Sequence, residues 1–156
     1  MNQTTRCMSP NSAARRGVAI LECALVMPVL MLVLFAMLDL GLAAVRYNAL
    51  ADASRRVARE VILHGAVAPA SSGVWGPTSF SGTAASNSVI VTSIQNTLPT
   101  MARGDVNVSV TWPDSDNTPR DPVRVEVSYV HQPLVPAISV WGPITLRSVA
   151  TMHVVN

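Results

Sequence analysis

A basic pair, a glycine and a lone acid near the N-terminus are the residues of this 156-residue chain best suited to chemistry. Arg15, Arg16 and Gly17 precede an apolar stretch, and Glu22 stands inside it, about 9 Å along a helix from the basic pair. An ionised carboxylate in hydrocarbon is costly unless a positive group pairs with it. Cleavage after Gly17 would create such a group, the amine of Val18. The pattern therefore predicts a precursor that is cut at the membrane and then associates with similar chains. The alternative is that the carboxylate extends to the lipid head groups.

The helix that carries these residues is predicted to cross a membrane. Over residues 18–45 the only charged residues are Glu22 and Asp39, and this stretch exceeds the ~20 residues needed to span a bilayer. We place the membrane-spanning segment within 18–40. A cleaved secretory signal is the competing interpretation, but its apolar core would be only about 7–15 residues long. Residues 1–14 are polar and small, and are expected to be disordered.

The same helix is predicted to continue beyond the membrane. One apolar stripe recurs at three- and four-residue spacing, formed by Leu50, Ala53, Val57 and Val61. Asp52 is expected to face Arg55 and Arg56 across one turn, and Arg56 is expected to face Glu60. Gly65 is a natural stop for the helix.

Residues 65–156 are predicted to form a small domain. Its first part, 65–87, is rich in Gly, Ser, Thr, Ala and Pro and is typical of a loop or linker. A four-residue apolar spacing then predicts a short helix from about Ala84, stopped by Pro99. The apolar triplet 89–91 within it is equally compatible with a strand.

Beyond residue 105 the apolar period changes to two, which predicts strands. The expected strands are 106–112, 123–129 and 144–155, with an acidic turn at 113–122. Consecutive alternating strands favour an antiparallel sheet with one solvated face. We expect the short helix and the end of the long helix to cover its other face.

The predicted organisation is therefore α+β, with a long transmembrane helix before a small antiparallel sheet. Residues 1–17 form a leader, 18–64 form the long helix, and 65–156 form the domain that follows it. The positive-inside rule places Arg15 and Arg16 in the cytoplasm. The domain is then expected in the periplasm of a bacterium, beyond a single pass through the inner membrane.

Charge, cysteine and histidine content exclude several function classes. After cleavage, eight arginines face nine acids, so the mature chain lacks a basic footprint for nucleic acid. Cys7 lies in the leader and Cys23 in the apolar run, which makes an internal disulfide or metal site implausible. His64, His131 and His153 lack ligand-like spacing, so we expect structural or solvated roles for them.

The remaining polar motifs do not indicate catalysis. Asp114, Asp116 and Asp121 lack the glycine and distal glutamate of a calcium loop, so a solvated turn is favoured over weak calcium binding. The sequence holds no nucleophile motif or phosphate-binding glycine loop. We therefore expect no enzyme activity, cofactor or small-molecule substrate. The tryptophans are expected to pack in the domain rather than to stack on carbohydrate: Trp75, Trp112 and Trp141.

These features together resemble a known family. Arg15-Arg16-Gly17 followed by Glu22 resembles a type IV prepilin processing site. The segments that resemble the TadE-like family are Gly17–Pro28, Asp39-Leu40-Gly41, Tyr47-Asn48-Ala49 and Ala53–Arg59, with a weaker match over Val125–Tyr129, Pro133-Leu134 and Thr145-Leu146. Its members are pilin-like proteins of the tight-adherence (Flp, type IVb) pilus system. Cys23 stands where this family usually has an aromatic residue.

The resemblance implies cleavage by a prepilin peptidase between Gly17 and Val18, with Arg15, Arg16 and Glu22 recognised in processing or assembly. It implies a minor pilin or pilus assembly protein whose partners are other pilin-type subunits and the assembly machinery. Our favoured role is initiation of the adhesive fibre. One alternative is a minor pseudopilin of a type II secretion system. The other is an uncleaved, membrane-anchored periplasmic binding module.

Overall fold

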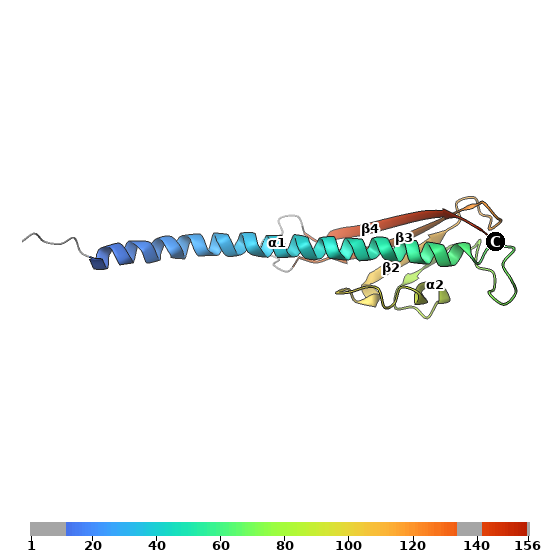
Figure 1. Cartoon of the computed structure of the whole chain (residues 1–156), viewed down its shortest axis with the longest axis horizontal. Helices are drawn as coiled ribbons and strands as arrows, with labels where there is room; N and C mark the ends of the chain where they lie inside the picture. The colour runs from blue at the N-terminus through green and yellow to red at the C-terminus, as the bar shows by residue number, and fades with distance from the viewer. Residues whose placement is uncertain (1–11, 134–141, 156) are drawn as a thin grey trace, which may run out of the picture. The chain divides into compact units, whose positions relative to one another are not determined.

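The computed structural model describes residues 12–133 and 142–155, with side chains from residue 17 onward, and its architecture is α+β. In chain order the elements are α1 (Ser12–Ile62), β1 (Phe80–Thr83), α2 (Val89–Thr92), the 3-10 helix η1 (Arg103–Asp105), β2 (Val106–Thr111), β3 (Pro122–His131) and β4 (Ile144–His153) (Figure 1). This confirms the predicted fold class of a long apolar helix followed by a small antiparallel sheet. The chain divides into two compact units after Leu38.

The first unit holds the N-terminal part of α1. This helix begins at Ser12, so the expectation of disorder was wrong for residues 12–14. Serine is favoured at helix starts and the two alanines after it are strong helix formers, which explains the earlier start. The backbone stays helical through Pro28. By length and composition, the stretch Gly17–His64 is the one helix in the described part of the chain able to cross a membrane, and its most apolar window is fully exposed.

The second unit is built on a four-stranded sheet in the order β1-β2-β3-β4. Each strand pairs antiparallel with its neighbours in sequence, for example Val108 with Val127 and Val127 with Ser148. The three strands expected from the two-residue period are present as β2, β3 and β4. β1 was missed, because Phe80 is its one large apolar residue and no alternation marks it.

The core lies between one face of this sheet and the second half of α1. The predicted helix stripe is fully buried at Leu50, Ala53, Val57 and Val61, and it packs with the inward valines of β2 and β3. Those valines are Val106, Val108, Val110, Val123, Val125 and Val127. The expected covering of the inner sheet face by the long helix is confirmed. Trp112 is also buried in this core, in agreement with its predicted packing role, whereas Trp141 lies outside the described residues.

The predicted short helix is largely wrong in extent. Only Val89–Thr92 form a helical turn, and hydrogen-bonded turns follow it. All four of its residues are β-branched, in the order valine, isoleucine, valine and threonine, and such residues disfavour a longer helix. The segment still buries Val91, Ile94 and Leu98 in the core.

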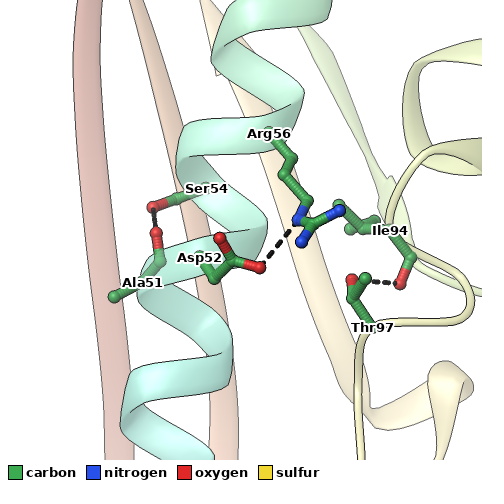
Figure 2. Close-up of polar contacts among 6 residues, drawn as sticks. All are labelled: Ala51, Asp52, Ser54, Arg56, Ile94 and Thr97. Carbon is green, nitrogen blue, oxygen red and sulfur yellow. Dashed lines mark hydrogen bonds and ion pairs between the residues drawn. The ribbon is translucent and has the colours of Figure 1, made fainter.

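The exposed and buried faces of α1 carry different polar contacts (Figure 2). On the exposed face, Arg56 Nε donates to Asp52 Oδ2 at 2.7 Å, as the spacing predicted. On the buried face, Ser54 donates to the carbonyl of Ala51 at 3.0 Å. Its oxygen lies 3.1 Å from Ser148 Oγ, so we infer that Ser148 donates in that contact. This bond joins α1 to β4 inside the core.

Asn117, in the turn between β2 and β3, joins three segments near the end of α1. Its side-chain oxygen accepts from Trp112 Nε1 at 3.1 Å, and its amide donates to the carbonyls of His64 and Trp75. His64 and Trp75 also stack, with ring centroids 3.7 Å apart. The acidic turn therefore has a structural role that its composition did not indicate. Close to it, the N–H of Val155 donates to the carbonyl of Ile62 at 3.1 Å.

Candidate functional site

The residues that the sequence singled out lie along the first part of α1. Gly17, Val18 and Glu22 are all exposed, and a side chain added at Gly17 would have nothing within 4 Å. Arg15 and Arg16 have helical backbones, but their side chains are outside the described part. The structure does not bring these residues together with any other polar group of the described chain. Cleavage after Gly17 and the pairing of Glu22 with the Val18 amine therefore stay predictions.

An exposed apolar surface surrounds Glu22. The side chains from Val18 to Leu38 that are large and apolar have exposed fractions between 42% and 74%. Cys23, beside the glutamate, is a free and exposed thiol. A surface of this kind is stable in hydrocarbon or against other apolar helices, and it is unsuited to water.

A second group of polar residues was not predicted, and it lies where β3 ends against α1. His131, the last residue of β3, is only 1% exposed. Its Nδ1 lies 2.7 Å from Arg46 NH1, and its Nε2 lies 3.3 Å from Asp39 Oδ1. Asp39 and Arg46 are two turns apart on α1, so both reach the same side of the helix.

The arginine fixes which ring nitrogen of His131 carries the proton. A guanidinium can only donate, so Nδ1 must accept and the neutral ring carries its proton on Nε2, facing Asp39. That contact is not a well-aligned hydrogen bond, and Nε2 has no other partner among the described residues. We therefore treat Nε2 and Asp39 as an electrostatic contact, weaker than the bond between Nδ1 and Arg46.

Arg46 is held from three further directions. Its NH2 donates to the carbonyl of Thr100 at 3.0 Å, and its Nε donates to the Thr100 hydroxyl at 3.4 Å. Its Cζ lies 5.4 Å from the ring centre of Tyr129, within the range of a cation–π contact. Thr100 has φ = 62°, a conformation that β-branched residues rarely adopt. This strained turn presents both of its oxygens to the arginine.

Arg46 also lines an open pocket of about 590 Å³. The other lining residues are Gly104, Asp105, Asn107, Tyr129, Val130 and Gln132. The pairing register explains the hollow. β2 starts at Val106, opposite Tyr129, whereas β3 continues through Val130 to His131 and pairs there with β4. The sheet therefore lacks a corner, and we call this hollow the corner pocket.

Sequence reasoning missed this group because its members are far apart in the chain. His131 lies 85 residues after Arg46 and carries no motif. The available signals were Asp39 and Arg46, the charged residues that follow the apolar run at a two-turn spacing. Within the described residues, no group of three or more His, Cys, Asp or Glu side chains is arranged to hold a metal ion.

Comparison with known proteins supports the resemblance stated above. Residues 17–59 match the family model described as TadE-like protein. No curated protein matches the chain, and no solved structure matches it. The match begins at Gly17 and covers the exposed apolar segment, Asp39, Arg46 and most of the buried helix stripe. The match lies wholly within α1, so it shows a likeness of this helix to the TadE-like family.

Proposed function

We propose that this TadE-like protein is a minor pilin or pilus assembly protein of the tight-adherence system, processed by a prepilin peptidase after Gly17. It works by association: its exposed apolar helix packs against other pilin-type helices in the inner membrane. The observation that carries the proposal is Glu22, an acid on an otherwise apolar and fully exposed segment that matches the TadE-like family. An adhesive fibre, or the machinery that starts one, is where such a subunit acts.

Glu22 gives this association its register. In hydrocarbon an unpaired carboxylate is costly, and a partner amine relieves that cost only at one axial position. The amine of Val18 on a neighbouring subunit is that partner in our proposal. Glu22 then lies at the level of the neighbour's Val18, which corresponds to an axial offset of four residues, or about 6 Å.

The proposal is tested on the full chain expressed with its pilus genes. The mass of the membrane-extracted protein and its N-terminal sequence should show a mature chain that starts at Val18. Glu22→Gln keeps the shape of the side chain but removes its charge, and it should abolish co-purification with pilin-type subunits. The matched control is Glu60→Gln, on the same helix but in the second unit, which should leave co-purification intact.

The outcomes separate the competing functions. An intact Met1 end together with normal behaviour of Glu22→Gln contradicts the proposal and supports an uncleaved, anchored binding module. Processing with association to secretion-system subunits instead of pilus subunits supports a minor pseudopilin.

A separate experiment tests the orientation in the membrane. A protease added outside the inner membrane should remove the domain 65–156 and leave the N-terminus protected.

A further inference from the structure

The corner pocket holds polar groups that the fold does not use. The carboxylate of Asp105 and the side-chain amides of Asn107 and Gln132 make no hydrogen bond or ion pair with the described residues. All three side chains are exposed, so they are accessible to a ligand. A hollow of about 590 Å³ with such walls is within the size range of ligand sites.

Arg46 contributes a fixed cation to the lining of this pocket. Three of its five N–H groups are taken by His131 and Thr100. The other two, one on each terminal nitrogen, have no partner in the described part of the chain. Because the guanidinium is already fixed by these bonds and by the Tyr129 ring, an arriving anion pays little entropy for ordering it.

The pocket therefore offers one cation and one anion. Arg46 supplies the positive charge, and Asp105, which closes η1, supplies the negative charge. A ligand with a single negative and a single positive group matches this pair in charge, whereas a simple anion leaves Asp105 opposed to it. Asn107 and Gln132 can hydrogen-bond to the polar atoms between those two groups.

The distance from the membrane indicates which zwitterion is available, and this step depends on the anchor proposed above. Arg46 follows residue 40, the end of the predicted span, by six residues, or about 9 Å of helix. Lipid head groups occupy roughly 5–7 Å on each side of the hydrocarbon. Tyr47, the next residue, is an aromatic of the kind enriched at that level. The arginine side chain is therefore within reach of lipid phosphates.

We propose that the corner pocket binds an aminoalkyl phosphate, with the phosphate on Arg46 and the primary ammonium on Asp105. The ethanolamine phospholipid headgroup and free phosphoethanolamine share this chemistry. Bound headgroups would hold the domain at the membrane surface before assembly.

The experiment uses the full-length protein in nanodiscs of phosphatidylcholine that contain either phosphatidylethanolamine or phosphatidylglycerol. Lipids retained after gentle release are counted by native mass spectrometry. We expect preferential retention of phosphatidylethanolamine, because phosphatidylglycerol lacks an amine and the quaternary amine of phosphatidylcholine cannot donate to Asp105. Removing one charge-assisted contact should weaken retention about tenfold. Asp105→Asn and Arg46→Gln should both show this loss.

Two controls keep the test decisive. Arg124→Gln removes an exposed arginine of β3 that does not line the pocket, and it should retain lipid normally. Asp105→Asn changes only the carboxylate and keeps the bond from the backbone N–H to the carbonyl of Ala102, so loss of binding in this variant is not expected to come from unfolding. In a second arm, soluble phosphoethanolamine is titrated into detergent-solubilised protein, and amide shifts at Asp105 and Asn107 are followed by NMR. Binding in this arm alone identifies the free compound as the ligand.

Equal retention of the two lipids combined with no shift by phosphoethanolamine overturns the inference. So does unchanged binding in Asp105→Asn. A protein that is processed at Gly17 and associates with pilin-type subunits, but shows neither form of binding, refutes the pocket assignment and leaves the proposed function standing. Headgroup retention by a protein that remains uncleaved supports the pocket assignment and refutes the proposed function.

Discussion

Replacing His131 by phenylalanine tests the contacts that join the end of β3 to α1. The aromatic ring has a similar volume, so the buried site stays filled, but Arg46 loses the acceptor that lies 2.7 Å away. A hydrogen bond to a charged group contributes about 1.5–3 kcal/mol. Asp39 also loses the Nε2–H that faces it, although it is 24% exposed and is partly solvated. We expect a total destabilisation of about 3 kcal/mol, most of it from the arginine bond.

The measurement is urea unfolding of the full chain in micelles, followed by tryptophan fluorescence. Trp75 and Trp112 both lie in the second unit, so the signal reports on the sheet domain. With a urea dependence of about 1.5 kcal/mol per molar, the midpoint should fall by about 2 M. His153→Phe is the matched control, because His153 ends β4 and is exposed, and it should shift stability by less than about 0.5 kcal/mol.

The midpoint comparison, a double-mutant cycle and the ring chemical shifts can each contradict this reasoning. If His131→Phe and His153→Phe shift the midpoint equally, the contacts with Arg46 and Asp39 contribute nothing to stability. A double-mutant cycle of His131→Phe with Arg46→Met should give a coupling above about 1 kcal/mol. The nitrogen chemical shifts of the His131 ring should show the proton on Nε2, and a proton on Nδ1 contradicts the assigned direction of the arginine bond.

The core, the turn and one glycine yield three more predictions for the same unfolding assay. Leu50→Ala should cost about 3 kcal/mol because Leu50 is fully buried, whereas the exposed Val67→Ala should be nearly neutral. Asn117→Ala should cost about 3 kcal/mol, since it leaves the Trp112 side-chain N–H and the Trp75 carbonyl without a partner, whereas the His64 carbonyl keeps the backbone N–H of Trp75. Gly76→Ala should shift the fluorescence of Trp112 and destabilise the domain by more than about 1 kcal/mol, because φ is 86° there and a Cβ would lie 2.5 Å from the indole ring.

Much of the fold was predictable because its periodic signals are local. Alternating valines in β2 and β3 marked both strands, and the stripe from Leu50 to Val61 marked the helix face that covers them. Each pattern reflects one buried face of one element, so it can be read without knowing the neighbours. β1 was missed because its place at the sheet edge depends on pairing with β2, and its own residues carry no such pattern.

The candidate sites also divide into one that local sequence indicates and one that only the folded chain brings together. Glu22 could be proposed from the sequence, because its cost in hydrocarbon follows from the residues around it in the chain. The group of Asp39, Arg46 and His131 was not found, because it depends on where β3 ends relative to α1, a property of the folded chain. Asn117 escaped for the same reason, since all its side-chain partners lie in other segments or across the turn.

The strand order has a consequence for how the domain forms. The sheet is a meander in which every strand joins its chain neighbour, so hairpins can zip sequentially with little loop-closure cost. Yet closure waits for the segment that follows β4, because Val155 supplies the donor that caps the carbonyl of Ile62 at the C-terminus of α1. The helix end is therefore sealed only when the segment that follows β4 has reached it, however early the hairpins form.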